Sequence, residues 1–304
     1  MIRPHGIIPA MVTPFDQEGR LNEPVVRSMI RRLLQAGAHG IFVLGTNGEF
    51  FALTEDEKIE LVRIAADEIG GAVPLYAGSG AITTAETICL SRKLEEAGAD
   101  ILSVITPHFV PLNQSELHSH FEAAAGSTNL PIVLYNIPAR TGIMLEAATV
   151  ASLSGIANIV GVKDSSGNYE HVLQLIQQSG PDFAVLAGTD SFILSTLLAG
   201  GAGAIAASAN VAPDTVVSIY KHWQEGQLEE AAKSQADIAV VRKLMQFGTV
   251  PSGLKEILSQ LGIEVGSPRL PVQPVGAEAR NTIAATLHAA GLLKEGNSHA
   301  NIGR

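Results

Sequence analysis

The stretch "IVGVKDSSGN", residues 159–168, joins an apolar run to a cluster of small polar residues, and Lys163 stands at the junction. The run is short and rich in β-branched residues, as expected of a buried parallel strand that ends in a turn. Lysine is among the residue types that are least often buried, so its place at the end of such a strand needs a reason. The strand-then-turn pattern itself recurs along the chain.

Seven other segments share this pattern, and consecutive segments begin 18 to 34 residues apart. Segments typical of helices separate them, among them residues 23–38, which end at a turn at Gly37, and residues 54–71, where Thr54 and Glu57 form a plausible capping box. Eight βα units over about 220 residues predict an α/β protein, a (β/α)8 TIM barrel. A doubly wound open sheet is the alternative, but eight evenly spaced units favour closure. The eight apolar segments begin at Gly6, Gly40, Val73, Ile101, Pro131, Ile159, Ala184 and Ala202.

Residues from 227 onward carry helical patterns only, over 228–246, 251–262 and 276–293. We therefore expect two domains: a catalytic (β/α)8 barrel over residues 1–226 and a C-terminal helical domain over residues 227–304.

The composition narrows the class of protein. The chain has 304 residues, a net charge of −10 and no run rich in lysine and arginine, which argues against nucleic acid or an anionic membrane as a partner. No apolar run reaches the ~18–20 residues needed to span a bilayer. Prolines at positions 4, 9 and 14 interrupt the N-terminal apolar stretch, so a signal peptide is not expected. With a single cysteine, Cys89, the sequence predicts a cytoplasmic protein.

In a (β/α)8 barrel the active site lies at the carboxyl ends of the strands, which is where Lys163 is expected. Burial there favours the neutral amine over the ammonium form, and a neutral amine can attack a carbonyl carbon to form a Schiff base. The alternative is a salt bridge from Lys163 to Asp164 or Asp190. The other lysines fall on polar, helix-like stretches, at positions 58, 93, 221, 233, 243, 255 and 294.

Three further features end strands of the predicted barrel. Tyr135 could exchange a proton with a substrate or simply cap the core, and Arg140 could hold a carboxylate through two hydrogen bonds or lie on the surface. The turn at residues 45–48, "GTNG", offers backbone N–H groups suited to a small carboxylate. The nine histidines show no metal-binding spacing, so no metal site is predicted.

Four motifs, taken together, resemble those of the pyruvate-dependent, Schiff-base-forming lyases typified by dihydrodipicolinate synthase and N-acetylneuraminate lyase. They are "GTNGEF" (45–50), "YNIPARTG" (135–142), "VKDSSGN" (162–168) and "AGTD" (187–190). The resemblance begins near Ile7 and covers nearly the whole chain. It implies a barrel with a C-terminal helical domain, a small 2-oxo acid such as pyruvate as substrate, no metal or organic cofactor, and a homotetramer or homodimer.

The resemblance also implies roles for individual residues. Lys163 would be the Schiff-base lysine, Tyr135 the proton shuttle and Thr46 its relay partner. Thr46 and Asn47 would bind the pyruvate carboxylate. The remaining implied substrate-binding residues are Gly188 and Ile205 in the pyruvate pocket and Arg140 at the second substrate.

Two departures from the synthase pattern bear on the substrate. Asn47 stands where the synthase usually has a second hydroxyl residue. His108 and Phe109, which we also predict to bind substrate, replace paired tyrosines, the second of which enters the neighbouring subunit's site in the synthase. Because Phe109 cannot pass a proton, a relay through His108 is our hypothesis for this chain.

The positions that match the synthase's lysine feedback site are also changed. Phe50, Lys58 and Ile82 stand where small or polar groups are expected. We therefore expect little inhibition by free lysine.

Several functions fit these residues. Arg140 matches the synthase pattern, which favours condensation of pyruvate with an aldehyde, aspartate semialdehyde in particular. The alternative is an aldolase or dehydratase that acts on a 2-oxo acid such as 2-keto-3-deoxygluconate or 4-hydroxy-2-oxoglutarate. A non-catalytic sensor that binds 2-oxo acids is the alternative from another class of protein.

Overall fold

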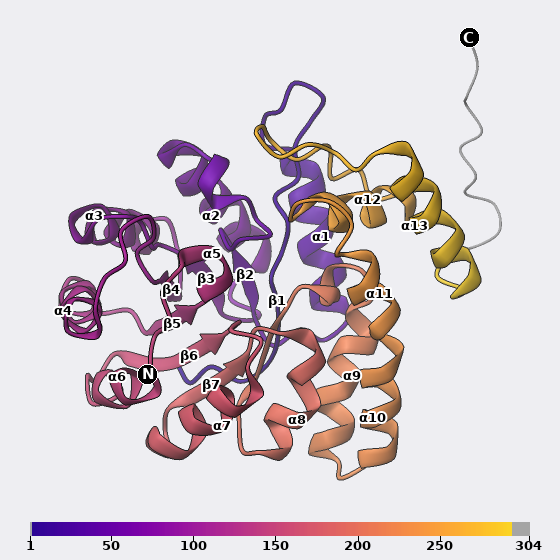
Figure 1. Ribbon diagram of the computed structural model, residues 1–304. Coiled ribbons are helices and arrows are strands. Elements are labelled where there is room, and N and C mark those ends of the chain that lie inside the picture. The colour runs from indigo at the N-terminus through magenta and orange to yellow at the C-terminus, as the bar shows by residue number, and fades with distance from the viewer. Residues whose placement is uncertain (1, 294–304) are drawn as a thin grey trace.

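A computed structural model describes residues 2–293, with eight parallel strands at its centre (Figure 1). Neighbouring strands pair in the order β1-β8-β7-β6-β5-β4-β3-β2. The barrel closes where the N–H of Met11, just after β1, donates to the carbonyl of Phe42 in β2 at 2.9 Å. This confirms the predicted (β/α)8 TIM barrel and not the open sheet. The strands are β1 (Gly6–Pro9), β2 (Ile41–Val43), β3 (Leu75–Gly78), β4 (Ile101–Ile105), β5 (Ile132–Asn136), β6 (Ile159–Asp164), β7 (Ala184–Ala187) and β8 (Gly203–Ala206).

Helices connect the strands and surround them. The capping box predicted at Thr54 and Glu57 is present and begins α2. Gly37, with φ of +82°, turns the chain after α1, in a conformation that glycine adopts without strain. The helices are α1 (Glu23–Gln35), α2 (Glu55–Ile69), α3 (Thr84–Glu96), α4 (Gln114–Ala125), α5 (Pro138–Thr141), α6 (Ala147–Leu153), α7 (Tyr169–Gln178), α8 (Ile193–Leu198) and α9 (Pro213–Gln224), with short 3-10 turns η1 (Phe50–Ala52), η2 (Asp190–Phe192) and η3 (Ser208–Asn210).

Two apolar layers hold the barrel together. One lies between the strands and the surrounding helices, and the other fills the barrel interior, where Phe42, Tyr76 and Leu186 pack together. Because alternate residues of a strand point to opposite faces, every second residue of each strand faces this interior. The inward residues at the carboxyl ends of the strands therefore form the floor of any site at that end.

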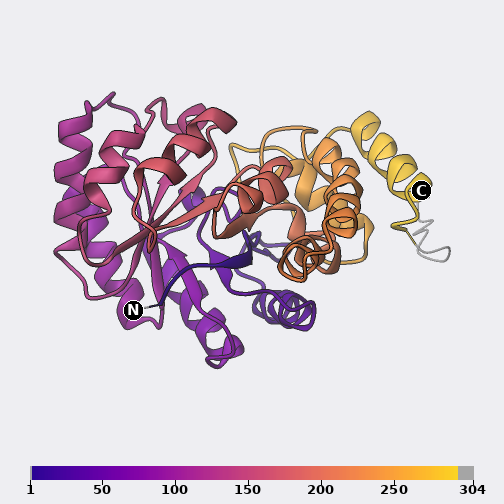
Figure 2. The same ribbon diagram turned by 90° about the horizontal axis from the view of Figure 1, so that it is seen from below.

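The described chain after residue 227 is helical, as the sequence predicts, but the first of the three predicted segments forms two helices, so that there are four: α10 (Leu228–Asp237), α11 (Ala239–Leu244), α12 (Ser252–Gln260) and α13 (Ala277–Ala289). They lie to one side of the barrel, and α10 packs against α9 (Figure 2). The division into domains at residues 226 and 227 stays a prediction, and residues 294–304, which include Lys294, lie outside the described part of the chain. Across residues 2–293, no helix combines the length and apolar character needed to cross a membrane.

Candidate active site

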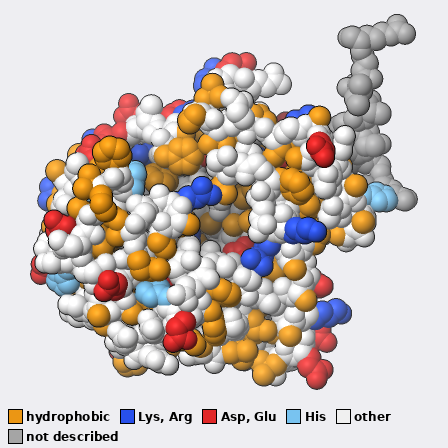
Figure 3. Space-filling view, in the orientation of Figure 1, with side chains coloured by type: hydrophobic (Ala, Val, Ile, Leu, Met, Phe, Trp, Pro, Cys, Tyr) orange, Lys and Arg blue, Asp and Glu red, His pale blue; other side chains and the backbone are white. Residues whose placement is uncertain are grey.

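A cavity of about 500 Å³ opens at the carboxyl ends of the strands. Figure 3 shows a hollow at the centre of this face, with basic side chains at its border. Most of the residues that the sequence singles out meet in this cavity. Its lining from the barrel and its loops includes Thr46, Asn47, Tyr135, Arg140, Lys163, Gly188, Asp190 and Ile205.

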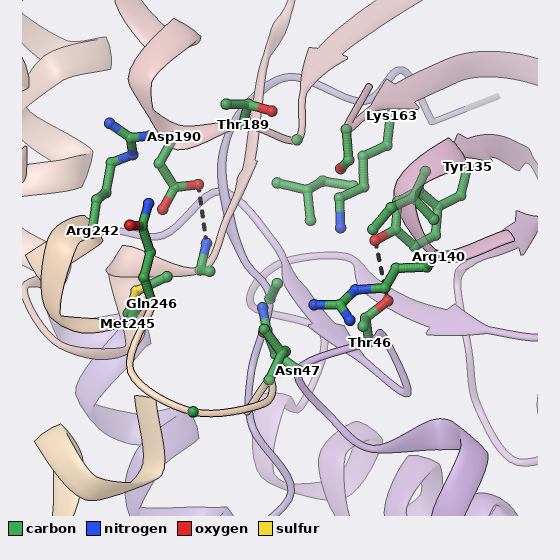
Figure 4. Close-up of a pocket in the computed structure, with 18 residues that line it drawn as sticks. Thr46, Asn47, Tyr135, Arg140, Lys163, Thr189, Asp190, Arg242, Met245 and Gln246 are labelled. Carbon is green, nitrogen blue, oxygen red and sulfur yellow. Dashed lines mark hydrogen bonds between the residues drawn. The ribbon is translucent and has the colours of Figure 1, made fainter. Parts of the chain in front are cut away.

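Lys163 reaches the cavity from β6 and is only 4% exposed. Its Nζ lies 4.1 Å from the centroid of the Tyr135 ring and 5.0 Å from that of Phe42 (Figure 4). Within residues 2–293 this nitrogen has neither a hydrogen-bond partner nor an ion-pair partner. An amine in this position is held by aromatic rings and faces the space that a ligand would fill.

The two carboxylates considered as partners for Lys163 bind other groups. Asp164 accepts hydrogen bonds from Asn136 Nδ2 at 2.7 Å and Ser166 Oγ at 2.6 Å. Asp190 accepts from the backbone N–H groups of residues 207 and 208 at 3.2 Å and 2.7 Å. The salt bridge weighed as an alternative for Lys163 is therefore not formed.

Tyr135 lies beside Lys163 because the two residues are register partners on β5 and β6. The Tyr135 hydroxyl is 3.2 Å from Thr46 Oγ1, within hydrogen-bond distance, and either oxygen can donate. The structure thus brings together an amine, a phenol and a hydroxyl. This arrangement can move a proton between a substrate atom at Lys163 and the Thr46 turn.

The turn that carries Thr46 and Asn47 has an unusual backbone, with positive φ at Leu44 (60°) and Glu49 (54°). Such conformations are costly for residues other than glycine, and surrounding contacts must hold them. Thr13 Oγ1 donates to the Gly48 carbonyl at 2.6 Å, and Glu49 is fully buried with polar partners. The turn is therefore fixed with Thr46 and Asn47 at the cavity.

Gly188 lies at the end of β7, where the chain passes close to β6. A Cβ at this position would lie 2.1 Å from Ser165 Oγ and 2.8 Å from the carbonyl oxygen of Asp164. Only glycine fits this approach, and it leaves room in the cavity beside Ile205, which is buried at the end of β8.

His108 and Phe109 do not line this cavity in the described chain. Phe109 is 90% exposed, with φ of +85°, on the loop after β4, and His108 beside it is half-buried. Their part in substrate binding stays a prediction.

Sequence reasoning missed one wall of the cavity. It comes from α11 and the segment after it, which lie far along the chain from every motif. The only local signal was the Gly248 and Pro251 break between two helical patterns. The missed lining residues are Arg242, Met245, Gln246, Gly248 and Val250.

Lys255, which the sequence places on a polar helical stretch, does lie on a helix, α12, but is buried there. Its Nζ forms an ion pair with Glu49 Oε1 at 2.6 Å. Among the residues that the structure describes, no group of three or more His, Cys, Asp or Glu side chains is placed to hold a metal ion.

A parallel barrel with a buried lysine and a neighbouring tyrosine at the carboxyl ends of its strands is the arrangement expected of a Schiff-base-forming pyruvate lyase. Residues 3–290 match the pattern of the dihydrodipicolinate synthetase family, and the chain belongs to that family. It is a lyase of this family.

Relatives of known sequence and structure agree with this assignment. A 4-hydroxy-tetrahydrodipicolinate synthase of Methanopyrus kandleri is 36% identical over 293 residues, 96% of this chain and 98% of the relative. A DapA-like lyase of Halobacterium salinarum, described as uncharacterized, is 36% identical over 95% of both chains. Among solved structures, YagE from E. coli K12, a prophage protein in complex with pyruvate, has a TM-score of 0.91 and 34% identity, covering 95% of this chain and 99% of its own.

Proposed function

We propose that this protein condenses pyruvate with an aldehyde through a Schiff base on Lys163, and that the aldehyde is aspartate semialdehyde. The observation that carries the proposal is the Lys163 amine, buried at the cavity without a carboxylate partner and beside the Tyr135 ring. The name of the Methanopyrus relative and the place of Arg140 in the cavity support the aldehyde.

In the proposed mechanism, the lone pair of Lys163 Nζ attacks C2 of pyruvate, and the oxygen at C2 takes a proton through Tyr135 and Thr46. Loss of water from this carbinolamine gives an iminium ion, which acidifies the hydrogens at C3. Removal of a C3 proton gives an enamine. Its C3 then forms a bond to the aldehyde carbon, whose oxygen is protonated, and hydrolysis of the iminium frees Lys163.

Substrate groups have binding partners on the cavity wall. The turn at Thr46 and Asn47 would hold the pyruvate carboxylate through backbone N–H groups and polar side chains. Gly188 and Ile205 would line the methyl side of pyruvate. Arg140 would bind the carboxylate of the aldehyde.

A second candidate is aldol cleavage or dehydration of a larger 2-oxo acid. This reaction uses the same Schiff base on Lys163 as the condensation and differs in the group that reacts with the enamine. Two observations favour it: Phe109 offers no hydroxyl, and no second tyrosine lines the cavity in the described residues. A close relative described as an uncharacterized lyase leaves the substrate class open as well.

The test is a substrate panel. Purified protein is assayed with pyruvate and a series of aldehydes that includes aspartate semialdehyde, and in parallel for pyruvate release from 2-keto-3-deoxygluconate and 4-hydroxy-2-oxoglutarate. If kcat/KM is highest with aspartate semialdehyde, the result supports the proposed condensation of pyruvate with this aldehyde. Pyruvate release from a 2-oxo acid at a higher kcat/KM would replace it by the second candidate.

We also propose a homodimer or homotetramer. Exposed apolar side chains follow three neighbouring strands, and Phe109 is the most exposed of them. One similar structure is described as a monomeric variant, so the assembly is best measured directly. Light scattering of Phe109→Asp should show smaller particles than the parent chain; equal particle mass would argue against this surface. The exposed apolar residues that follow β2, β3 and β4 are Phe51, Ile82, Phe109 and Val110.

A further inference from the structure

The cavity holds one positively charged side chain that the proposed chemistry does not use, Arg242 of α11. In Figure 4 it lies on the opposite side of the cavity from Arg140, and Lys163 lies above Arg140. Gln246, one turn further along the chain, lines the same side. These two side chains place hydrogen-bond donors at the end of the cavity away from the Thr46 turn.

Arg242 differs from the other half-buried arginines of the chain. Arg27 pairs with three carboxylates, Arg32 donates to the carbonyls of residues 210 and 211, and Arg269 pairs with Glu57. Within residues 2–293, the Arg242 guanidinium has no hydrogen bond and no ion pair. A guanidinium carries five N–H donors, and the half-buried Arg242, which lines the cavity, uses none of them on a protein partner within residues 2–293.

The nearest carboxylate does not supply this pairing. Asp190 lies on the same side of the cavity, but both of its oxygens accept backbone N–H groups of the β8 loop, and it forms no ion pair with Arg242. The donors of Arg242 are therefore available to a molecule in the cavity. The chain as a whole carries a net charge of −10, so a local excess of positive groups around one cavity favours an anionic ligand there.

We propose that Arg242, with Gln246, forms a second anion-binding subsite that holds a carboxylate or phosphate at the far end of the substrate. The substrate would thus carry one anionic group at the Thr46 turn, next to the reacting carbon, and a terminal anionic group that on this inference binds Arg242 rather than the Arg140 assigned to the aldehyde carboxylate above. Guanidinium suits such a group because it can donate two parallel hydrogen bonds to one oxyanion. This inference rests on the proposed function, because it takes the Schiff base at Lys163 as the fixed end of the substrate.

The test uses matched pairs of 2-oxo acids, so that it needs no knowledge of the natural aldehyde. Straight-chain 2-oxo dicarboxylates of five, six and seven carbons are each compared with the 2-oxo monocarboxylate of equal length. The half-saturating concentration of each is measured from borohydride trapping on Lys163. A 2-oxo acid that ends in a phosphonate separates a phosphate preference from a carboxylate preference.

We expect the parent chain to bind at least one dicarboxylate about 10- to 100-fold more tightly than its monocarboxylate partner, the range typical of a hydrogen bond to a charged group. Arg242→Met should abolish this ratio. Lys243→Met, which removes one positive charge from the adjacent exposed residue, should keep it.

Three results would overturn the inference. The parent chain could show no preference for any terminal anion, the preference could survive Arg242→Met, or it could be lost in Arg140→Met alone. Failure of pyruvate itself to trap on Lys163 would instead contradict the proposed function.

Discussion

Two lysines of this chain are buried almost equally and do different work. Lys163 is 4% exposed and Lys255 is 2% exposed, and each Nζ lies about 4 Å from an aromatic ring centroid, at 4.1 Å and 4.2 Å. Lys255 pairs with Glu49 at 2.6 Å and donates to the carbonyl of Ser267 at 3.2 Å, whereas Lys163 has no such partner within residues 2–293. Burial alone therefore does not identify a reactive lysine.

The difference lies in what each amine faces. Lys255 joins α12 to the turn that ends at Glu49, so its charge is used to hold two distant parts of the chain together. Lys163 faces a cavity of about 500 Å³ and is left available for a ligand. A lysine that is buried, unpartnered and open to a cavity is the combination that indicates chemistry.

The strongest test of the comparison is removal of the Lys163 amine, which we propose reacts with the substrate. Lys163→Met should lower kcat by about 10³-fold or more, because the Schiff base cannot form, while the melting temperature stays near that of the parent chain. The measurement is steady-state kinetics with the best substrate of the panel. Lys243→Met, an exposed lysine changed in the same way, should keep full activity.

The next largest effect is expected at the proposed proton path through Tyr135 and Thr46. Tyr135→Phe keeps the ring against Lys163 and removes the hydroxyl that contacts Thr46, so kcat should fall by about 10²- to 10⁴-fold. In Thr46→Val, kcat should fall less, because the Tyr135 hydroxyl remains. If Tyr135→Phe has the same kcat as the parent chain, the Tyr135 hydroxyl does not transfer a proton in the reaction.

Lys255 should matter for stability rather than chemistry. Lys255→Met leaves the fully buried Glu49 carboxylate without its partner, which costs about 3–5 kcal/mol of unfolding free energy. The double variant Glu49→Gln with Lys255→Met removes both charges and should recover much of this loss. Urea unfolding of the two variants and the parent gives the comparison. Equal stability of Lys255→Met and the parent chain would contradict a structural role.

The same network predicts a dependence of stability on pH. The Arg269 guanidinium, which pairs with Glu57, lowers the pKa of that carboxyl from 4.5 to about 2. The unfolded chain therefore binds a proton more readily than the folded one, and the contribution is present above about pH 4.5 and lost as the pH falls toward 2. Between about pH 4.5 and pH 2, the free energy of unfolding measured with urea should fall less steeply for Glu57→Gln than for the parent chain. If the free energy of unfolding depends on pH equally in Glu57→Gln and the parent chain, the Glu57–Arg269 pair does not contribute to this pH dependence.

The smallest effect is expected at the altered feedback positions. Ile82 and Lys58, with Phe50, replace small or polar groups, so free lysine should leave the rate unchanged at micromolar concentrations. A lysine titration at fixed pyruvate measures this. Inhibition at micromolar lysine would show that another set of residues binds it.

Local patterns were sufficient to predict most of the barrel. Eight apolar runs, their turn residues and the Thr54 capping box predicted the strands, the closure and the start of α2. The strand-end rule then placed Lys163 and Tyr135 at the same end of the barrel, and in the structure the two residues are register partners on adjacent strands. These predictions rest on short stretches of sequence.

Contacts between distant parts of the chain could not be predicted in this way. Glu49 and Lys255 are far apart in sequence, and nothing near Lys255 distinguishes it from a surface lysine of an amphipathic helix. Arg242 reaches the cavity only because α11 packs beside the barrel mouth. The orientation of the Phe109 loop is likewise set by packing, with φ of +85° at an exposed aromatic residue.

The most direct test of the account is covalent capture of the intermediate. The protein is incubated with pyruvate and sodium borohydride, digested, and mapped by mass spectrometry. We predict one reduced pyruvate adduct per chain, on the peptide that contains Lys163, with Lys255 unmodified. No adduct, or an adduct on another lysine, would contradict the claim that the free amine at this cavity is the one that reacts.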